Sequence, residues 1–262
     1  MSLVSVVIPS AKAPVRPAIT STDPFAPSTT CIGDALGMET VVIVVGTGAK
    51  IKSFKIHKTL LCAKVTFFDK MFNGPFSEAS TQTASLTDEE VASFKLFLGW
   101  LYQDRIPVPP SFAQCGMGEI EQLCRLFALA EKYNVTLLAD QTMDFMTAFM
   151  KKRCWTLSSV LIGTCYEITH QSSKLRIFAC RFHVYQTLHY PSDATGTARV
   201  TWSNREMLKV LKNSDDLFAD FYGMLRLQAG KSRVDPRYEL PCDYHQHGKN
   251  EMCPYITAAK KL

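Results

Sequence analysis

The stretch VVIVVGTGAKIKSFKIHKTLL, residues 41–61, decides the fold. Its first five residues, Val41–Val45, are all β-branched and stop at Gly46, which is typical of a buried strand that ends at a turn. Phe54 and Ile56 then alternate with polar residues, which predicts a second, half-exposed strand. Because only a short glycine-containing loop separates the two runs, we predict an antiparallel β-hairpin.

After the hairpin, apolar residues recur every three or four positions, which indicates helices in the rest of the chain. This spacing predicts a helix over 58–73. Thr87 and Glu90 match a capping box and predict that the next helix starts there, with Phe94 in its buried stripe. Residues 203–206 repeat the capping-box pattern. We therefore expect an α+β fold: a small β-sheet with a flanking helical cluster, followed by an α-helical extension.

The chain divides into four parts by composition. Residues 1–37 hold five prolines and many serines and threonines without apolar periodicity, which predicts a disordered tail. We expect the compact α+β domain over 38–150, the helical extension over 151–230, and a C-terminal Cys/His segment over 231–262.

Composition excludes several classes of protein. Of the 262 residues, 47% are hydrophobic and 20% are charged, as in an ordinary globular protein. The net charge of +5 is small and its basic residues are scattered, so we expect no nucleic-acid partner. The longest aliphatic run, Val41–Val45, is too short to cross a membrane. Nine cysteines and no secretory signal predict free thiols and an intracellular location, cytoplasmic or nuclear.

Neither of two candidate catalytic patterns has the context that its chemistry needs. Gly46–Lys50 (GTGAK) precedes a strand, whereas a phosphate-binding loop must open a helix. His57 lies near Cys62, but nothing fixes the two as base and nucleophile. We therefore expect no enzymatic activity, and we expect His57 to pack at the junction between strand and helix.

A cluster of candidate metal ligands lies near the C-terminus. Cys242, His245, His247 and Cys253 follow the pattern C-x2-H-x-H-x5-C, and tetrahedral zinc is bound by Cys and His ligands of this kind. Two interpretations remain open: a structural zinc site, and a polar tail in which these residues occur together by chance. If zinc binds, we expect the metal to hold the segment, because so short a stretch lacks a hydrophobic core of its own.

From residue 41 to about 146 the sequence resembles the BTB/POZ domain. The motifs that carry the resemblance occur in the family's order: FKIHKTLL (54–61), FFDKMF (67–72), FSE (76–78), LY (101–102) and LAEKYNV (129–135). The remainder is similar, more loosely, to fungal BTB proteins that carry a helical C-terminal extension. Val65 departs from the family pattern, which usually has serine at that point.

The resemblance implies a protein–protein interaction module that acts as an adaptor or scaffold and performs no chemistry. In substrate adaptors of cullin-type ubiquitin ligases, a hydrophobic-x-Glu motif contacts the cullin, and Phe76 and Glu78 match it. The other interpretation of these two residues is a solvated loop. An alternative function is a transcriptional regulator whose Cys/His segment is a zinc module.

The resemblance also bears on self-association. Many BTB domains form strand-swapped homodimers through an extra N-terminal helix and strand. The proline-rich residues before Val41 offer no candidate for that helix, so we expect the swapped dimer to be absent.

Overall fold

The structure is a computed structural model that describes residues 36–108, 117–189, 203–231, 234–248 and 251–253. The disordered tail expected over 1–37 therefore lies almost wholly outside the described residues.

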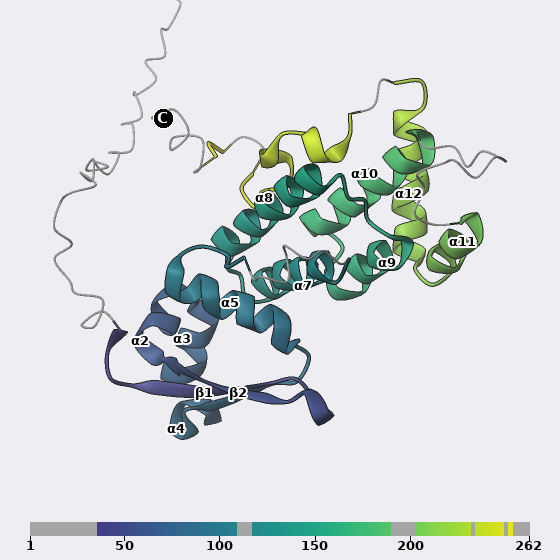
Figure 1. Ribbon diagram of the computed structural model, residues 1–262. Helices are drawn as coiled ribbons and strands as arrows, with labels where there is room; N and C mark the ends of the chain where they lie inside the picture. Colours follow the sequence, from purple (N-terminus) through teal and green to yellow (C-terminus); the bar gives the residue numbers. More distant parts are fainter. Residues whose placement is uncertain (1–35, 109–116, 190–202, 232–233, 249–250, 254–262) are drawn as a thin grey trace, which may run out of the picture. The chain divides into compact units, whose positions relative to one another are not determined.

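A small three-stranded sheet forms one end of the described body (Figure 1). Its strands are β1 (Thr40–Val45), β2 (Lys52–His57) and β3 (Thr83–Leu86), in the order β2-β1-β3. β1 pairs antiparallel with β2 through the turn η1 (Gly48–Lys50), which confirms the predicted hairpin. β3 joins the other edge of β1 in parallel.

Helices make up most of the rest, and with the sheet they confirm the α+β fold class. They are α2 (Lys58–Lys64), α3 (Thr66–Asn73), α4 (Ser77–Thr81), α5 (Val91–Gln103), α7 (Met117–Lys132), α8 (Thr136–Arg153), α9 (Ser159–Ile168), α10 (Lys174–His189), α11 (Asn204–Lys212) and α12 (Asp215–Gln228). In Figure 1, α2, α3 and α5 lie on one side of the sheet and α4 on the other. We call α9–α12 the helical extension.

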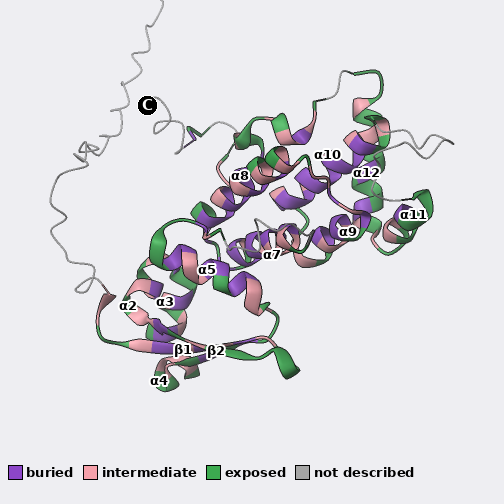
Figure 2. Ribbon diagram, in the orientation of Figure 1, coloured by how far each residue is buried: buried purple, intermediate pink, exposed green. Residues whose placement is uncertain are grey.

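One hydrophobic core runs from the sheet into the helical extension. Figure 2 shows buried residues along the facing sides of α7, α8 and α10. The thiol of Cys124 on α7 lies 3.8 Å from the sulfur of Met146 on α8 and 3.8 Å from that of Cys165 on α9. These three buried sulfur atoms pack where the two parts of the chain meet, so the extension shares the core of the α+β region.

Two sequence-based expectations fail in the first hundred residues. The helix predicted over 58–73 is broken at Val65, whose extended backbone separates α2 from α3 while its side chain is buried. Strand β3 was not predicted at all. It is short and half polar, and only Ala84 and Leu86 face the core. Tertiary burial of a few apolar side chains overrides local pattern at both places.

The capping box predicted at Thr87 is also wrong. α5 begins at Val91 after Glu90, and the Thr87 hydroxyl donates instead to the Asp88 carboxylate. The box at residues 203–206 is confirmed, since the Ser203 hydroxyl accepts from the Glu206 amide and the Glu206 carboxylate accepts from the Ser203 amide.

His183 is a buried titratable side chain between α10 and α12. Its ring is 1% exposed and stacks on Phe221 with the ring centroids 4.3 Å apart. Burial lowers the pKa of His183 from 6.5 to about 4. The folded protein therefore keeps this imidazole neutral at pH values where the unfolded chain protonates it.

We predict that Phe94→Ala lowers the free energy of unfolding by about 3–5 kcal/mol, because Phe94 is fully buried on α5. Ser203→Ala should cost about 1 kcal/mol through loss of its cap. Thr87→Ala should cost less than about 0.5 kcal/mol, because Thr87 caps no helix. Urea melts of the three variants measure the order, and a Thr87→Ala cost as large as that of Ser203→Ala would contradict it.

We also predict that His183 makes the protein less stable in acid. As the pH falls from 6.5 towards 4, the unfolded state takes up a proton that the native state does not, so stability falls by up to about 3 kcal/mol. His183→Phe should remove this part of the pH dependence. Urea melts between pH 7 and pH 4 compare the two proteins, and parallel stability curves would refute the assignment.

Candidate functional site

The C-terminal segment, residues 234–248 and 251–253, packs against α8 and α10. It forms two short turns, η2 (Pro236–Tyr238) and η3 (Pro241–Asp243). Tyr244 is only 2% exposed, and its ring meets that of Phe178 edge-on, with the centroids 5.2 Å apart. The segment needs no core of its own, because Tyr244 anchors it in the core of the extension; a metal is therefore not the sole candidate for holding it in place.

Polar contacts hold the same segment at several points. The Gln246 amide donates to Asp140 Oδ1 on α8 at 2.7 Å. The Arg237 guanidinium donates to the carbonyl of Trp155 at 2.9 Å, just beyond the end of α8. On α10, Arg181 pairs with Glu239 at 2.8 Å. The segment is thus tied to both helices over most of its described length.

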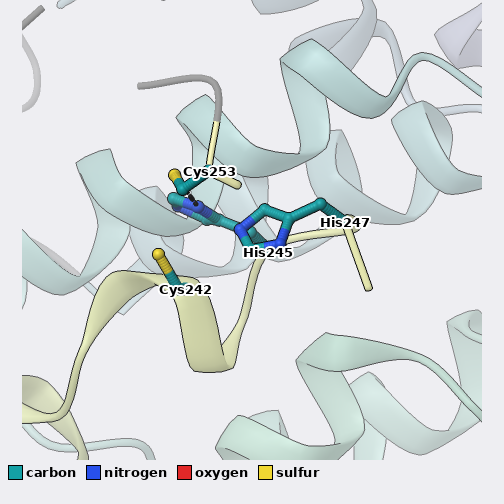
Figure 3. Close-up of side chains that lie close together, drawn as sticks. All are labelled: Cys242, His245, His247 and Cys253. Carbon is teal, nitrogen blue, oxygen red and sulfur yellow. Dashed lines mark hydrogen bonds between the residues drawn. The ribbon is translucent and has the colours of Figure 1, made fainter. Parts of the chain in front are cut away.

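The four predicted metal ligands come together on this segment. One ligand atom from each of Cys242, His245, His247 and Cys253 lies within 4.8 Å of the other three. Figure 3 shows the four side chains converging, with Cys242 on the turn η3. His245 and Cys253 are buried, and the other two are partly buried. The four donor atoms are thus close enough together to be compatible with one metal ion.

The two histidines offer different nitrogens to the cluster. His245 Nε2 lies 3.0 Å from Asp144 Oδ1, and its Nδ1 lies 3.6 Å from Cys253 Sγ. In His247 the two nitrogens exchange roles: Nδ1 contacts an oxygen, the Gly248 carbonyl at 3.0 Å, and Nε2 is the nitrogen left for the cluster. His247 Nε2 is buried and has no hydrogen-bond partner among the described residues. A buried nitrogen of this kind is costly unless something accepts its lone pair.

This donor set suits zinc. Two thiolates and two imidazoles form the closed tetrahedral set of structural zinc sites. Bond lengths of about 2.0–2.3 Å would place the ligand atoms roughly 3.3–3.8 Å apart, so the longest separation would need to close by about 1 Å. Four protein ligands leave no open position for a substrate or a reactive water.

The local electrostatics show which protons a metal must displace. Burial and a hydrogen bond with Cys253 raise the pKa of the Cys242 thiol. Burial lowers the pKa of His245, but the hydrogen bonds to Asp144 and Cys253 outweigh it and raise the pKa to about 9. Metal binding at this cluster would therefore release protons.

Asp140 and Asp144 are functional candidates that the sequence did not reveal. They lie one turn apart on α8, about a hundred positions before the residues they contact. Their i, i+4 spacing on a helix was the one available signal, and it says nothing about which distant segment they meet.

The predicted partner-binding residues lie elsewhere, at the start of α4. Phe76 is 55% exposed and precedes the first turn of the helix, and Glu78 lies within that turn. Glycine is needed at position 74, where the chain leaves α3 on its way to Phe76, because a Cβ there would lie 2.2 Å from the Lys70 carbonyl oxygen. Phe76 is thus exposed and Glu78 is half-buried, and a single residue separates them.

His57 packs at the strand-to-helix junction, as expected. Its Nδ1 lies 2.9 Å from the Tyr102 hydroxyl, and its own amide also donates to that oxygen. Tyr102 therefore ties the end of α5 to the β2–α2 junction, and His57 contacts no nucleophile.

A model of the BTB/POZ domain family matches residues 37–149. The chain contains a BTB/POZ domain. This matches the geometry above, in which the hairpin, β3, helices α2, α3, α4, α5 and α7, and most of α8 fall within the matched residues. BTB/POZ domains are generally protein-interaction modules and not enzymes.

Curated relatives that carry a BTB domain match about half of the chain. Kelch repeat and BTB domain-containing protein 4 of Homo sapiens is 20% identical over 138 residues, covering 53% of this chain. The protein of the same name from Pongo abelii is also 20% identical over 138 residues. The match spans only 21% and 22% of these relatives' own length, respectively.

Within the described residues, every helix is too short or too polar to cross a lipid bilayer.

Proposed function

We propose that this protein is an adaptor that binds other proteins through its BTB/POZ domain, and that one partner is a cullin of a ubiquitin ligase. The exposed side chain of Phe76 carries this proposal. A phenylalanine that is 55% exposed contributes little to the fold and offers an apolar anchor to a partner. Glu78, within the first turn of α4, places a negative charge close to it in the sequence.

The second proposed component is a structural zinc ion held by Cys242, His245, His247 and Cys253. The buried Nε2 of His247 is its main support, because among the described residues nothing hydrogen-bonds to it. The alternative, in which this segment is a DNA-reading zinc module, gains no support from the fold. The described part of the segment contains only short turns and packs on α8 and α10, so it presents no recognition helix.

For the partner surface, we predict that Phe76→Ala weakens cullin binding at least tenfold, as expected on removing an aromatic anchor. Glu78→Ala should weaken it less. Isothermal titration of the full chain against a purified cullin measures both. Tyr238→Ala is the matched control, because Tyr238 is an equally exposed aromatic at 64% but lies on the C-terminal segment. Wild-type protein that fails to bind cullins, or Phe76→Ala that binds as well as wild type, would contradict the cullin proposal.

For the metal, we predict about one zinc ion per chain in protein purified without added metal. Cys242→Ser should lower the zinc content well below one, while Cys154→Ser should leave it unchanged, since Cys154 is an exposed thiol outside the cluster. Elemental analysis measures the content. Tyr244 should keep the segment docked in Cys242→Ser, as judged by unchanged circular dichroism. If wild-type protein contains no zinc, the zinc proposal is wrong and the segment is a metal-free one in which the four residues occur together by chance.

A further inference from the structure

The carboxylate of Asp144 lies behind the candidate metal site. It belongs to α8, within the matched BTB/POZ domain, and its Oδ1 is 3.0 Å from His245 Nε2. The His245 side chain is 1% exposed, whereas that of Asp144 is 44% exposed. The contact therefore links a buried imidazole of the C-terminal segment to the solvent side of a BTB helix.

The neighbouring contact fixes where this imidazole lies. Asp140, one helical turn before Asp144, accepts the backbone amide of Gln246 at 2.7 Å. Two carboxylates on one face of α8 therefore hold two consecutive residues of the segment, one through its side chain and the next through its backbone. With Nε2 held by Asp144 and the next residue held by Asp140, the other ring nitrogen of His245, Nδ1, faces Cys253 Sγ at 3.6 Å.

We propose that Asp144 is the positioning residue of the metal site, and that zinc binding is thereby coupled to the last helix of the BTB/POZ domain. This inference rests on the proposed zinc site. A metal-binding imidazole must present a lone pair from one nitrogen while the other carries the proton. A carboxylate that accepts the Nε2 proton fixes the tautomer, orients the ring and makes Nδ1 a better donor.

The two histidines differ in what orients them. The oxygen that holds His247 is the carbonyl of the very next residue, Gly248. The oxygen that holds His245 comes from 101 positions earlier in the chain. Among the two histidines, it is therefore His245 whose ring is oriented by a side chain of α8. Removal of the Asp144 carboxylate should weaken zinc binding without removing a ligand.

The test is zinc affinity, measured by competition with a chromophoric chelator on the full chain. Asp144→Ala should bind zinc about 10–100-fold more weakly than wild type, the usual cost of losing such a partner. Asp144→Asn keeps an acceptor oxygen but loses the charge, so its loss should be smaller. Asp243→Asn is the matched control, because it removes the same charge from the residue that follows Cys242, and the Asp243 carboxylate pairs with Arg181, which is not one of the four ligands. It should stay within about twofold of wild type.

Cobalt substitution supplies a second readout that a purely structural role would not change. The visible bands of cobalt bound to the wild-type site should shift in Asp144→Ala, because the His245 ring is no longer held in place, and should not shift in Asp243→Asn.

The outcomes separate the two proposals. Wild-type protein that binds no zinc would refute the metal site itself. If wild-type protein and Asp144→Ala bind zinc with equal affinity, the zinc site is supported but the proposed role of Asp144 is wrong. Equal losses in Asp144→Ala and Asp243→Asn would also overturn it, since they would indicate a general effect of charge. If Asp144→Ala fails to fold, the zinc affinity of Asp144→Asn is compared with that of wild type and of Asp243→Asn instead, and the same outcomes apply.

Discussion

A carboxylate near the start of α8, that of Asp140, constrains the path of the C-terminal segment. Asp140 is only 3% exposed, and a carboxylate removed from water is costly unless donors surround it. The amide of Gln246 supplies such a donor from 106 positions away. Once Gln246 is fixed there, Tyr244 reaches the core beside Phe178, and His245 meets Asp144. The arrangement of the cysteine and histidine side chains follows from this docking.

α8 consequently serves two parts of the protein. Through its buried Met146 it packs against Cys124 of α7, and through Asp140 and Asp144 it receives the C-terminal segment. In Figure 1 this segment lies at the end of the body away from the sheet and from α4. Among the described residues, the surface that carries Phe76 therefore lies apart from the Cys/His cluster. Such a division suits an adaptor, whose binding surface must stay exposed while the rest of the chain is held rigid.

Much of this could be predicted from the sequence, for identifiable reasons. The hairpin followed from the β-branched run and its glycine turn, and α7 and α8 followed from long apolar periodicities. β3 and the break at Val65 could not be predicted, because a few buried side chains outweigh a weak local pattern at both places. The Cys/His cluster was visible because its four residues are close in sequence. Asp144 was not, because its role depends on a contact across 101 positions.

The central claim is that the C-terminal segment is an integral part of the fold, docked on α8 by Asp140 and Asp144. Hydrogen–deuterium exchange of residues 241–248 in the intact purified protein tests it most directly. The account predicts slow exchange at the Gln246 amide, comparable with that of amides within α8, because its donor is bound to a buried carboxylate. Exchange within seconds across the whole stretch, as in an unstructured peptide, would contradict the account.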